Sequence, residues 1–320
     1  MLKTFEETVS LIHEGKLLHI SGTGALLERL PKGDWIGGST EYFTSEGGGR
    51  VSGDVLDVHE LDFREYKFAS YDAASLPQVT RDVYPNGFSI IILPFDSEVH
   101  RVYAENASEF EGMFLTNILG WISGVNLGIP GQTPVAANGS TGETFRDKAV
   151  VLHIALPEGK TAMMNIINIF EPDESGPVIT FSGSGFSAEK CRLDGAEIVF
   201  ADYIHKNGLD TKLPLVGDYS GAGVNISIKS IENGVVNFYA PVFTGINYRF
   251  AKDIPDYVGA FQGKIRELGE QRETFTCNCI LNFLYGGLEG KDLGGFYGPI
   301  TFGEVAWQLL NQTLVYLQIV

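Results

Sequence analysis

The C-terminal segment from Thr276 to Ile319 carries the side chains with the clearest chemical potential. Cys277 and Cys279 are one residue apart, and Glu304 follows directly after Gly303 between two apolar runs. A carboxylate in that setting needs a partner or a ligand if it is buried. A cysteine thiolate is a nucleophile when a histidine elsewhere in the chain serves as its base. The segment therefore offers either ligand binding or covalent chemistry.

A glycine pair followed by two hydroxyls forms a second candidate region near the N-terminus. The run is Trp35-Ile36-Gly37-Gly38-Ser39-Thr40-Glu41-Tyr42. A glycine pair lets another group approach the backbone closely, and its free N–H groups can hold an acidic group. The alternative reading is a strand with a glycine bulge.

Together the two regions predict a site for a small polar ligand. We expect backbone N–H groups and hydroxyls of the first region to hold an acidic group, and Glu304 to hold an ammonium. A zwitterionic ligand suits that polarity, and the expected partner is a small polar molecule such as an amino acid or a carboxylate. The expected ligand-binding residues are Trp35, Gly37, Gly38, Ser39, Thr40, Tyr42, Trp121, Cys277, Asn278, Asn282, Gly303 and Glu304.

Covalent chemistry at the cysteines is an open alternative. In it, Cys277 or Cys279 is the nucleophile of a hydrolase or transferase acting on a small amide or ester, with Asn278 or the glycine N–H groups stabilising an oxyanion. The non-catalytic alternative is that one thiol is buried and the other packs against neighbouring side chains. The histidines are dispersed, and the cysteine spacing is not that of a zinc knuckle, so no metal site is expected. His100 is expected at the surface, and His153 in the core.

Local patterns predict about ten strands and five helices. Helices are expected over residues 3–14, 97–114, 195–207 and 256–268, with Ser97 and Asp256 as caps. A buried strand is expected over residues 88–93, and a hairpin turn at Asn233-Gly234. Residues 149–156 and 162–170 are expected to form a hairpin. Residues 116–132, around Trp121, are expected to form an irregular glycine-rich loop.

These elements indicate an α+β protein with two intimately packed halves. The sheets should be mixed or mainly antiparallel and flanked by helices, because many strands join by hairpins and no regular strand–helix alternation appears. A soft boundary is placed in the loop at residues 211–223, which divides the chain into residues 1–210 and 211–320.

The net charge of the chain excludes some classes of binding partner. The chain has 320 residues and a net charge of -17, with 40 acidic and 23 Lys or Arg residues. Nucleic acid and anionic membrane surfaces require clustered positive charge, so neither is an expected partner. No apolar run is long enough to span a bilayer. Three cysteines are an odd number and fit reduced thiols. We expect a cytoplasmic protein.

Several of these motifs resemble those of FIST domains. The N-terminal FIST part carries a turn similar to Gly37-Gly38-Ser39-Thr40. The C-terminal part carries elements similar to Phe275-Thr276-Cys277, to Gly295-Phe296 through Phe302-Gly303-Glu304, and to Asn311-Gln312-Thr313-Leu314. The order and spacing match over most of the chain, with a patchy region between residues 50 and 270. The chain looks most like a stand-alone FIST-related bacterial protein.

The resemblance implies a sensory domain that binds small ligands, such as amino acids, in bacterial signal transduction. Haem binding with gas sensing is a second implication; otherwise no cofactor is expected. The family usually has an Arg a few residues after the cysteine, whereas this chain has Asn282-Phe283 there. No output segment is attached, so signalling is expected to go through a partner in trans.

Overall fold

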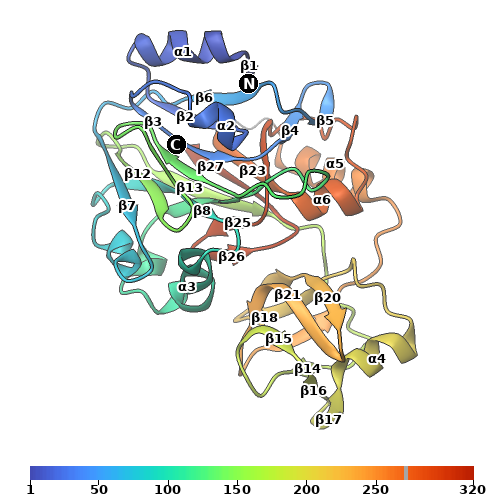
Figure 1. Cartoon of the computed structure of the whole chain (residues 1–320). Coiled ribbons are helices and arrows are strands. Elements are labelled where there is room, and N and C mark those ends of the chain that lie inside the picture. Colours follow the sequence, from blue (N-terminus) through green and yellow to red (C-terminus); the bar gives the residue numbers. More distant parts are fainter. Residues whose placement is uncertain (270–272) are drawn as a thin grey trace.

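Three six-stranded sheets form the larger part of the molecule, which we call the body (Figure 1). The structure is a computed structural model that describes residues 1–269 and 273–320. Within that range it contains twenty-seven strands, six α-helices and three short 3-10 helices. The sheets are antiparallel or mixed, which confirms the predicted α+β class.

Each sheet of the body combines strands that are distant in the sequence. The N-terminal sheet has the order β1 (Leu2–Lys3), β6 (Leu56–Glu60), β2 (Leu18–Gly22), β3 (Trp35–Ser39), β10 (Ala136–Asn138) and β11 (Glu143–Phe145). The central sheet has the order β26 (Gln308–Leu310), β25 (Glu304–Ala306), β9 (Ile118–Ser123), β8 (Gly87–Pro94), β12 (Ala149–Ala155) and β7 (Tyr66–Tyr71). The C-terminal sheet has the order β13 (Ala162–Ile167), β27 (Leu314–Ile319), β23 (Glu273–Cys279), β24 (Gly298–Thr301), β4 (Tyr42–Ser45) and β5 (Gly48–Val51).

The central sheet packs against both of the other sheets. A Cβ atom built on Gly38 of β3 would lie 2.6 Å from Ile92 of β8 and 2.7 Å from Trp121 of β9. On the other side, the Cys277 thiol of β23 donates to the carbonyl of Gly120 at 3.4 Å. These contacts leave no room for larger side chains, so the interior between the sheets is closely packed.

A second unit is built from the strands between residues 179 and 250 (yellow and orange in Figure 1). One of its sheets has the order β17 (Ala196–Val199), β16 (Lys190–Leu193), β14 (Ile179–Thr180), β22 (Asn247–Phe250), β18 (Leu215–Tyr219) and β19 (Ala222–Ile226). The other contains β15 (Gly185–Ala188), β21 (Val235–Val242) and β20 (Ile228–Glu232). Helix α4 (Phe200–Asn207) completes the unit.

Strand pairing groups the chain differently from the predicted division at residues 210 and 211. That division falls between α4 and β18, whereas β22 joins β18 to β14 within one sheet. The body contains strands that come before the second unit in the sequence and strands that come after it. Buried polar contacts connect the two parts, including a hydrogen bond of 2.7 Å from Ser227 Oγ to Gln312 Oε1.

The remaining helices lie in the body. They are α1 (Phe5–His13), α2 (Gly24–Leu27), α3 (Glu98–Asn106), α5 (Tyr257–Leu268), α6 (Ile280–Tyr285) and the 3-10 helices η1 (Leu76–Thr80), η2 (Ala107–Glu109) and η3 (Met113–Leu115). The side chains of Ser97 and Asp256 cap α3 and α5, as predicted. In the part of the chain that is described, no helix is both long enough and apolar enough to cross a membrane.

Three local secondary-structure predictions are wrong. The helix expected over residues 195–207 begins only at Phe200, because residues 196–199 form strand β17 and pair with β16. The expected loop at residues 116–132 contains strand β9, whose Trp121 is fully buried between sheets. The strands at residues 149–156 and 162–170 do not form a hairpin, because β12 pairs with β7 and β8 while β13 pairs with β27. Strand β12 is buried along most of its length and needs a neighbour on each side. The turn between β12 and β13 therefore connects the central sheet to the C-terminal sheet.

Candidate functional site

Glu304 lies in a closed polar cluster. Its side chain is fully buried, and its two oxygens accept hydrogen bonds from the hydroxyls of Thr301 at 3.1 Å and Thr313 at 2.8 Å. Burial raises the pKa of the Glu304 carboxyl to about 8, so the group is largely protonated at neutral pH. Its neighbours therefore satisfy Glu304 without an external cation.

The cysteines and asparagines of the same segment are also buried. Asn282 Nδ2 donates to Asn278 Oδ1 at 2.8 Å, and the side-chain Oδ1 of Asn282 accepts from the Tyr257 hydroxyl. Burial raises the pKa of both the Cys277 and Cys279 thiols well above the usual range. A protonated, enclosed thiol is a poor nucleophile. In this arrangement the cysteines pack the core.

The hydroxyls of the N-terminal motif form hydrogen bonds with backbone groups. Ser39 Oγ donates to the Gly124 carbonyl at 2.7 Å and accepts from the Val135 N–H at 2.9 Å. Thr40 Oγ1 donates to the Ile300 carbonyl at 2.7 Å. Gly37 and Gly38 lie within β3 and pair with strands on both sides, with no recorded bulge.

The aromatic residues of the predicted site lie apart from one another. Trp35 belongs to a small hydrophobic cluster beneath α1, and its indole N–H donates to the Pro31 carbonyl at 2.9 Å. Trp121 donates to His19 Nε2 at 2.9 Å, deep between the sheets. The Tyr42 hydroxyl accepts from the Leu127 N–H at 3.0 Å.

The predicted ligand-binding residues therefore do not line one pocket. The carbonyl of Gly303 accepts from the Ile122 N–H, so this glycine also belongs to the sheet framework. The bond from Thr40 to Ile300 does bring the two candidate motifs into contact. That contact is structural, because both groups are buried and their hydrogen bonds are internal.

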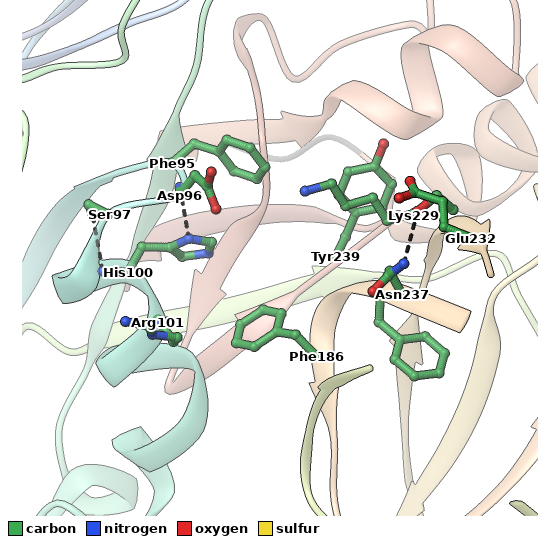
Figure 2. Close-up of a pocket in the computed structure, with 12 residues that line it drawn as sticks. Phe95, Asp96, Ser97, His100, Arg101, Phe186, Lys229, Glu232, Asn237 and Tyr239 are labelled. Atoms are coloured by element: carbon green, nitrogen blue, oxygen red, sulfur yellow. Dashed lines mark hydrogen bonds between the residues drawn. The ribbon is translucent and has the colours of Figure 1, made fainter. Parts of the chain in front are cut away.

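A cavity of about 420 Å³ lies elsewhere, between the body and the second unit (Figure 2). We call it the inter-unit cavity. The start of α3 and the residues before it form one wall, and strands β15, β20 and β21 form the other. Its lining residues are Phe95, Asp96, Ser97, His100, Arg101, Phe186, Lys229, Ser230, Glu232, Asn237, Phe238 and Tyr239.

Irregular pairing places two of these side chains. The register between β20 and β21 shifts between Ile228 and Ser230, which makes Lys229 the extra residue of a bulge. The register between β15 and β21 shifts between Gly185 and Ser187, so Phe186 also lies at an irregularity. Bulges re-aim side chains and are common beside binding sites. Here they direct a cation and an aromatic ring to the cavity.

On the α3 wall of the cavity, a hydrogen bond connects the backbone of Asp96 to the side chain of His100. Asp96 has a left-handed backbone conformation with a φ of 61°, and its N–H donates to His100 Nδ1 at 3.2 Å. Because Nδ1 accepts a hydrogen bond, the ring proton of the neutral imidazole lies on Nε2. Burial lowers the pKa of His100 to about 4, so the ring is neutral at pH 7. Among the described residues, Nε2 has no hydrogen-bond partner.

The prediction that His100 is a surface residue is wrong. Its side chain is 4% exposed and packs beside Phe95 and Phe186, with ring centroids 5.6 and 6.2 Å apart. Ser97 caps α3 by accepting from the His100 N–H at 3.2 Å, and this cap fixes the first turn so that His100 faces inward. The helical spacing alone did not show which face of α3 meets the second unit.

Each wall of the inter-unit cavity carries one acidic and one basic side chain, Asp96 and Arg101 on the α3 side and Lys229 and Glu232 on the strand side. Figure 2 shows Asp96 on the α3 side and Lys229 on the strand side. The Lys229 ammonium lies 5.7 Å from the centroid of the Phe95 ring. Within residues 1–269 and 273–320, neither Asp96 nor Lys229 has an ion-pair partner within 4.0 Å. Both charges are thus available to a ligand.

Sequence reasoning missed this cavity because its walls are far apart along the chain. The lining residues come from three stretches, around residues 95–101, 186 and 229–239. The one usable signal was Asp96-Ser97 at the start of a helix, which marks a cap and a special backbone position. No sequence pattern near Lys229 indicated that its side chain lines a cavity.

Comparison with known proteins identifies a family but no function. No curated protein sequence matches the chain. Among the described residues, no group of three or more His, Cys, Asp or Glu side chains is placed to hold a metal ion. Residues 3–320 match the model of a family of unknown function (DUF6976), and the chain belongs to that family.

Proposed function

We propose that the protein binds a small zwitterionic molecule of the amino-acid class in the inter-unit cavity. The observation that carries the proposal is that Asp96 and Lys229, two exposed charges without an ion-pair partner among the described residues, lie on facing walls. A zwitterion supplies an ammonium for Asp96 and a carboxylate for Lys229, so that both charges gain a partner on binding. The cavity volume of about 420 Å³ lies in the range of small-molecule sites.

The remaining lining groups suit the same ligand. Phe95, Phe186 and Tyr239 provide apolar walls for a side chain, and the Asn237 amide offers a further polar contact. His100 Nε2 carries a proton and has no partner, so it can donate to a carboxylate oxygen. That atom is sealed from water in this conformation. A ligand that reaches it requires a small movement of the cavity wall.

Such a movement supplies a route for signalling. The two walls belong to different parts of the molecule, and a ligand that contacts both favours their closed arrangement. We propose that a partner in trans reads this arrangement, as in a FIST-type sensor of bacterial signal transduction. All three cysteines are free thiols, which fits the reducing cytoplasm as the site of action.

Titration calorimetry with the twenty amino acids tests the proposal. Each ligand that binds is compared with its analogues lacking the amino or the carboxyl group. We expect one chemical class of amino acid to bind, and both analogues to bind at least about tenfold more weakly, since each loses one charged contact.

Two variants locate the site. Asp96→Asn keeps a residue that tolerates the left-handed backbone, and Lys229→Met keeps the length of the side chain. Both should weaken binding at least about tenfold, whereas the exposed Lys206→Met on α4 should leave it unchanged. Equal binding by Asp96→Asn and wild type, or no binding of any zwitterion, refutes the proposal.

A further inference from the structure

A second cavity lies at the carboxyl ends of neighbouring strands in the body. It has a volume of about 290 Å³ and shares no residue with the inter-unit cavity. Thr23 follows β2, Ser39 ends β3 and Thr40 comes directly after it, and Gly124 follows β9. Strands β2 and β3 are parallel, and the space beyond the carboxyl ends of parallel strands is a frequent ligand site. We call this space the Glu41 cavity.

The feature that distinguishes this cavity is a buried carboxylate. Glu41 is 6% exposed and lines the cavity. Its Oε2 accepts from Asn126 Nδ2 at 2.8 Å, and its Oε1 accepts from Gln132 Nε2 at 3.1 Å. In the described part of the chain, no Lys, Arg or His nitrogen lies within 4.0 Å of it.

Two neutral amides do not complete the environment of a buried anion. A carboxylate has about four lone-pair positions, and these hydrogen bonds use two of them. Buried carboxylates are normally matched by a cation, because removing an unmatched charge from water costs several kcal/mol. Glu41 therefore has both the charge and the free acceptor positions to bind an ammonium group.

The surroundings are suited to a small organic amine rather than to a bare metal ion. Two carboxylates line this cavity, the buried Glu41 and the exposed Glu28, whereas Ca²⁺ and Mg²⁺ need six or more oxygen ligands. The hydroxyls of Ser39 and Thr40 are already bonded to backbone carbonyls. Beside Glu41, the methyl groups of Thr23, Ala25 and Val135 line space for an alkyl chain.

We infer that the Glu41 cavity binds a primary organic amine, with the ammonium group on the Glu41 carboxylate and the alkyl chain in the space beside it. The competing possibility is internal. Arg146 lines the same cavity and is exposed, so a change of rotamer could bring its guanidinium to Glu41. The two possibilities make opposite predictions when Arg146 is replaced.

The test uses the full chain and n-butylamine as probe, with n-butanol as the uncharged control of the same length. We expect saturable butylamine binding by ligand-observed NMR, and no binding of butanol. Glu41→Gln should weaken butylamine binding at least about tenfold, because it removes the charge. Glu158→Gln, an exposed carboxylate that lines neither cavity, should leave it unchanged.

A second variant distinguishes a loss of butylamine binding from a loss of folding. Glu41→Gln places an amide against two amides and could loosen residues 124–135. Ala25→Leu instead fills the cavity from α2, where Ala25 is exposed, and leaves the Glu41 hydrogen bonds intact. It should abolish butylamine binding while the melting temperature stays near that of the wild type.

Three outcomes overturn the inference. These are the absence of butylamine binding to the wild type, binding that persists in both Glu41→Gln and Ala25→Leu, and binding that appears only after Arg146→Gln. The last result means that Arg146 is the natural partner of Glu41. Failure of amino acids to bind at the inter-unit cavity has no bearing on these results, because the sites are separate.

Discussion

The buried Glu304 makes a sharp prediction about how stability depends on pH. The pKa of its carboxyl is about 8 in the folded protein, against an ordinary value of 4.5. Since the folded pKa is raised, the folded state keeps a proton that the unfolded state releases. The stabilisation is complete below pH 4.5 and is lost as the pH rises toward 8.

The magnitude follows from the two pKa values. Between pH 5.5 and 7.5, the carboxyl is almost fully ionised in the unfolded chain and mostly protonated in the folded one. Each pH unit in this window costs about 1.36 kcal/mol, so the free energy of unfolding should fall by about 2.5 kcal/mol relative to a variant without the group. Glu304→Gln is that variant, since it keeps the size of the side chain and removes the titration.

The comparison with Glu304→Gln is needed because buried histidines act in the opposite direction. Burial lowers the pKa of His19 to about 3, and those of His100 and His153 to about 4. These groups take up protons in the unfolded chain below pH 6.5, so they make stability rise with pH up to that point. Their contribution is the same in wild type and variant and cancels in the difference.

Urea denaturation at pH 5.5, 6.5 and 7.5 measures the effect. The unfolding free energy of the wild type, minus that of Glu304→Gln, should become more negative by about 2.5 kcal/mol across this range. Glu158→Gln is the matched control, because its carboxylate is exposed at a turn and the difference should stay flat. A flat difference for Glu304→Gln would show that its carboxyl is ionised in the folded protein, and would refute the argument.

Four further predictions concern packing, thiol reactivity and buried hydrogen bonds. Gly38→Ala should destabilise the protein by about 1–3 kcal/mol in thermal or urea unfolding, because its Cβ meets Trp121 at 2.7 Å. Gly263→Ala, inside α5 with open space around it, should instead stabilise it by about 0.5–1 kcal/mol; the same sign for both would contradict the packing argument. The three buried thiols should resist Ellman's reagent at pH 8 until the protein unfolds, and fast labelling of Cys277 or Cys279 would reopen the cysteine-enzyme hypothesis. His153→Phe should cost about 2–4 kcal/mol in urea unfolding, since Ser89 and Tyr71 both lose a buried hydrogen bond; stability equal to wild type would show that water replaces the imidazole.

Features with a strictly local cause could be predicted from the sequence. Ser97 and Asp256 cap their helices because a side-chain oxygen reaches an N–H three residues on. Asn233 and Gly234 both have positive φ angles, as the predicted tight hairpin turn requires, and β20 and β21 pair across it. Each of these depends on only a few adjacent residues.

Features that depend on distant neighbours could not be predicted. Gly120 and Gly124 suggested a loop, yet a Cβ on Gly120 would meet the Ile91 carbonyl oxygen at 1.8 Å, so glycine is needed for close strand contact. Glu304 was expected to need a partner if buried. It has partners, but they are the hydroxyls of Thr301 and Thr313 rather than a ligand.

The position of β27 has a consequence for how the chain folds during synthesis. This strand spans Leu314–Ile319, yet it lies between β13 and β23 in the C-terminal sheet. The C-terminal sheet therefore cannot be completed until residues 314–319 have left the ribosome. Until then, the edge of β13 that pairs with β27 stays unpaired. The strands of the second unit pair only within residues 179–250, so this unit can form earlier. Such long-range closure predicts slow folding of the body and a dependence on protection of its unfinished sheet.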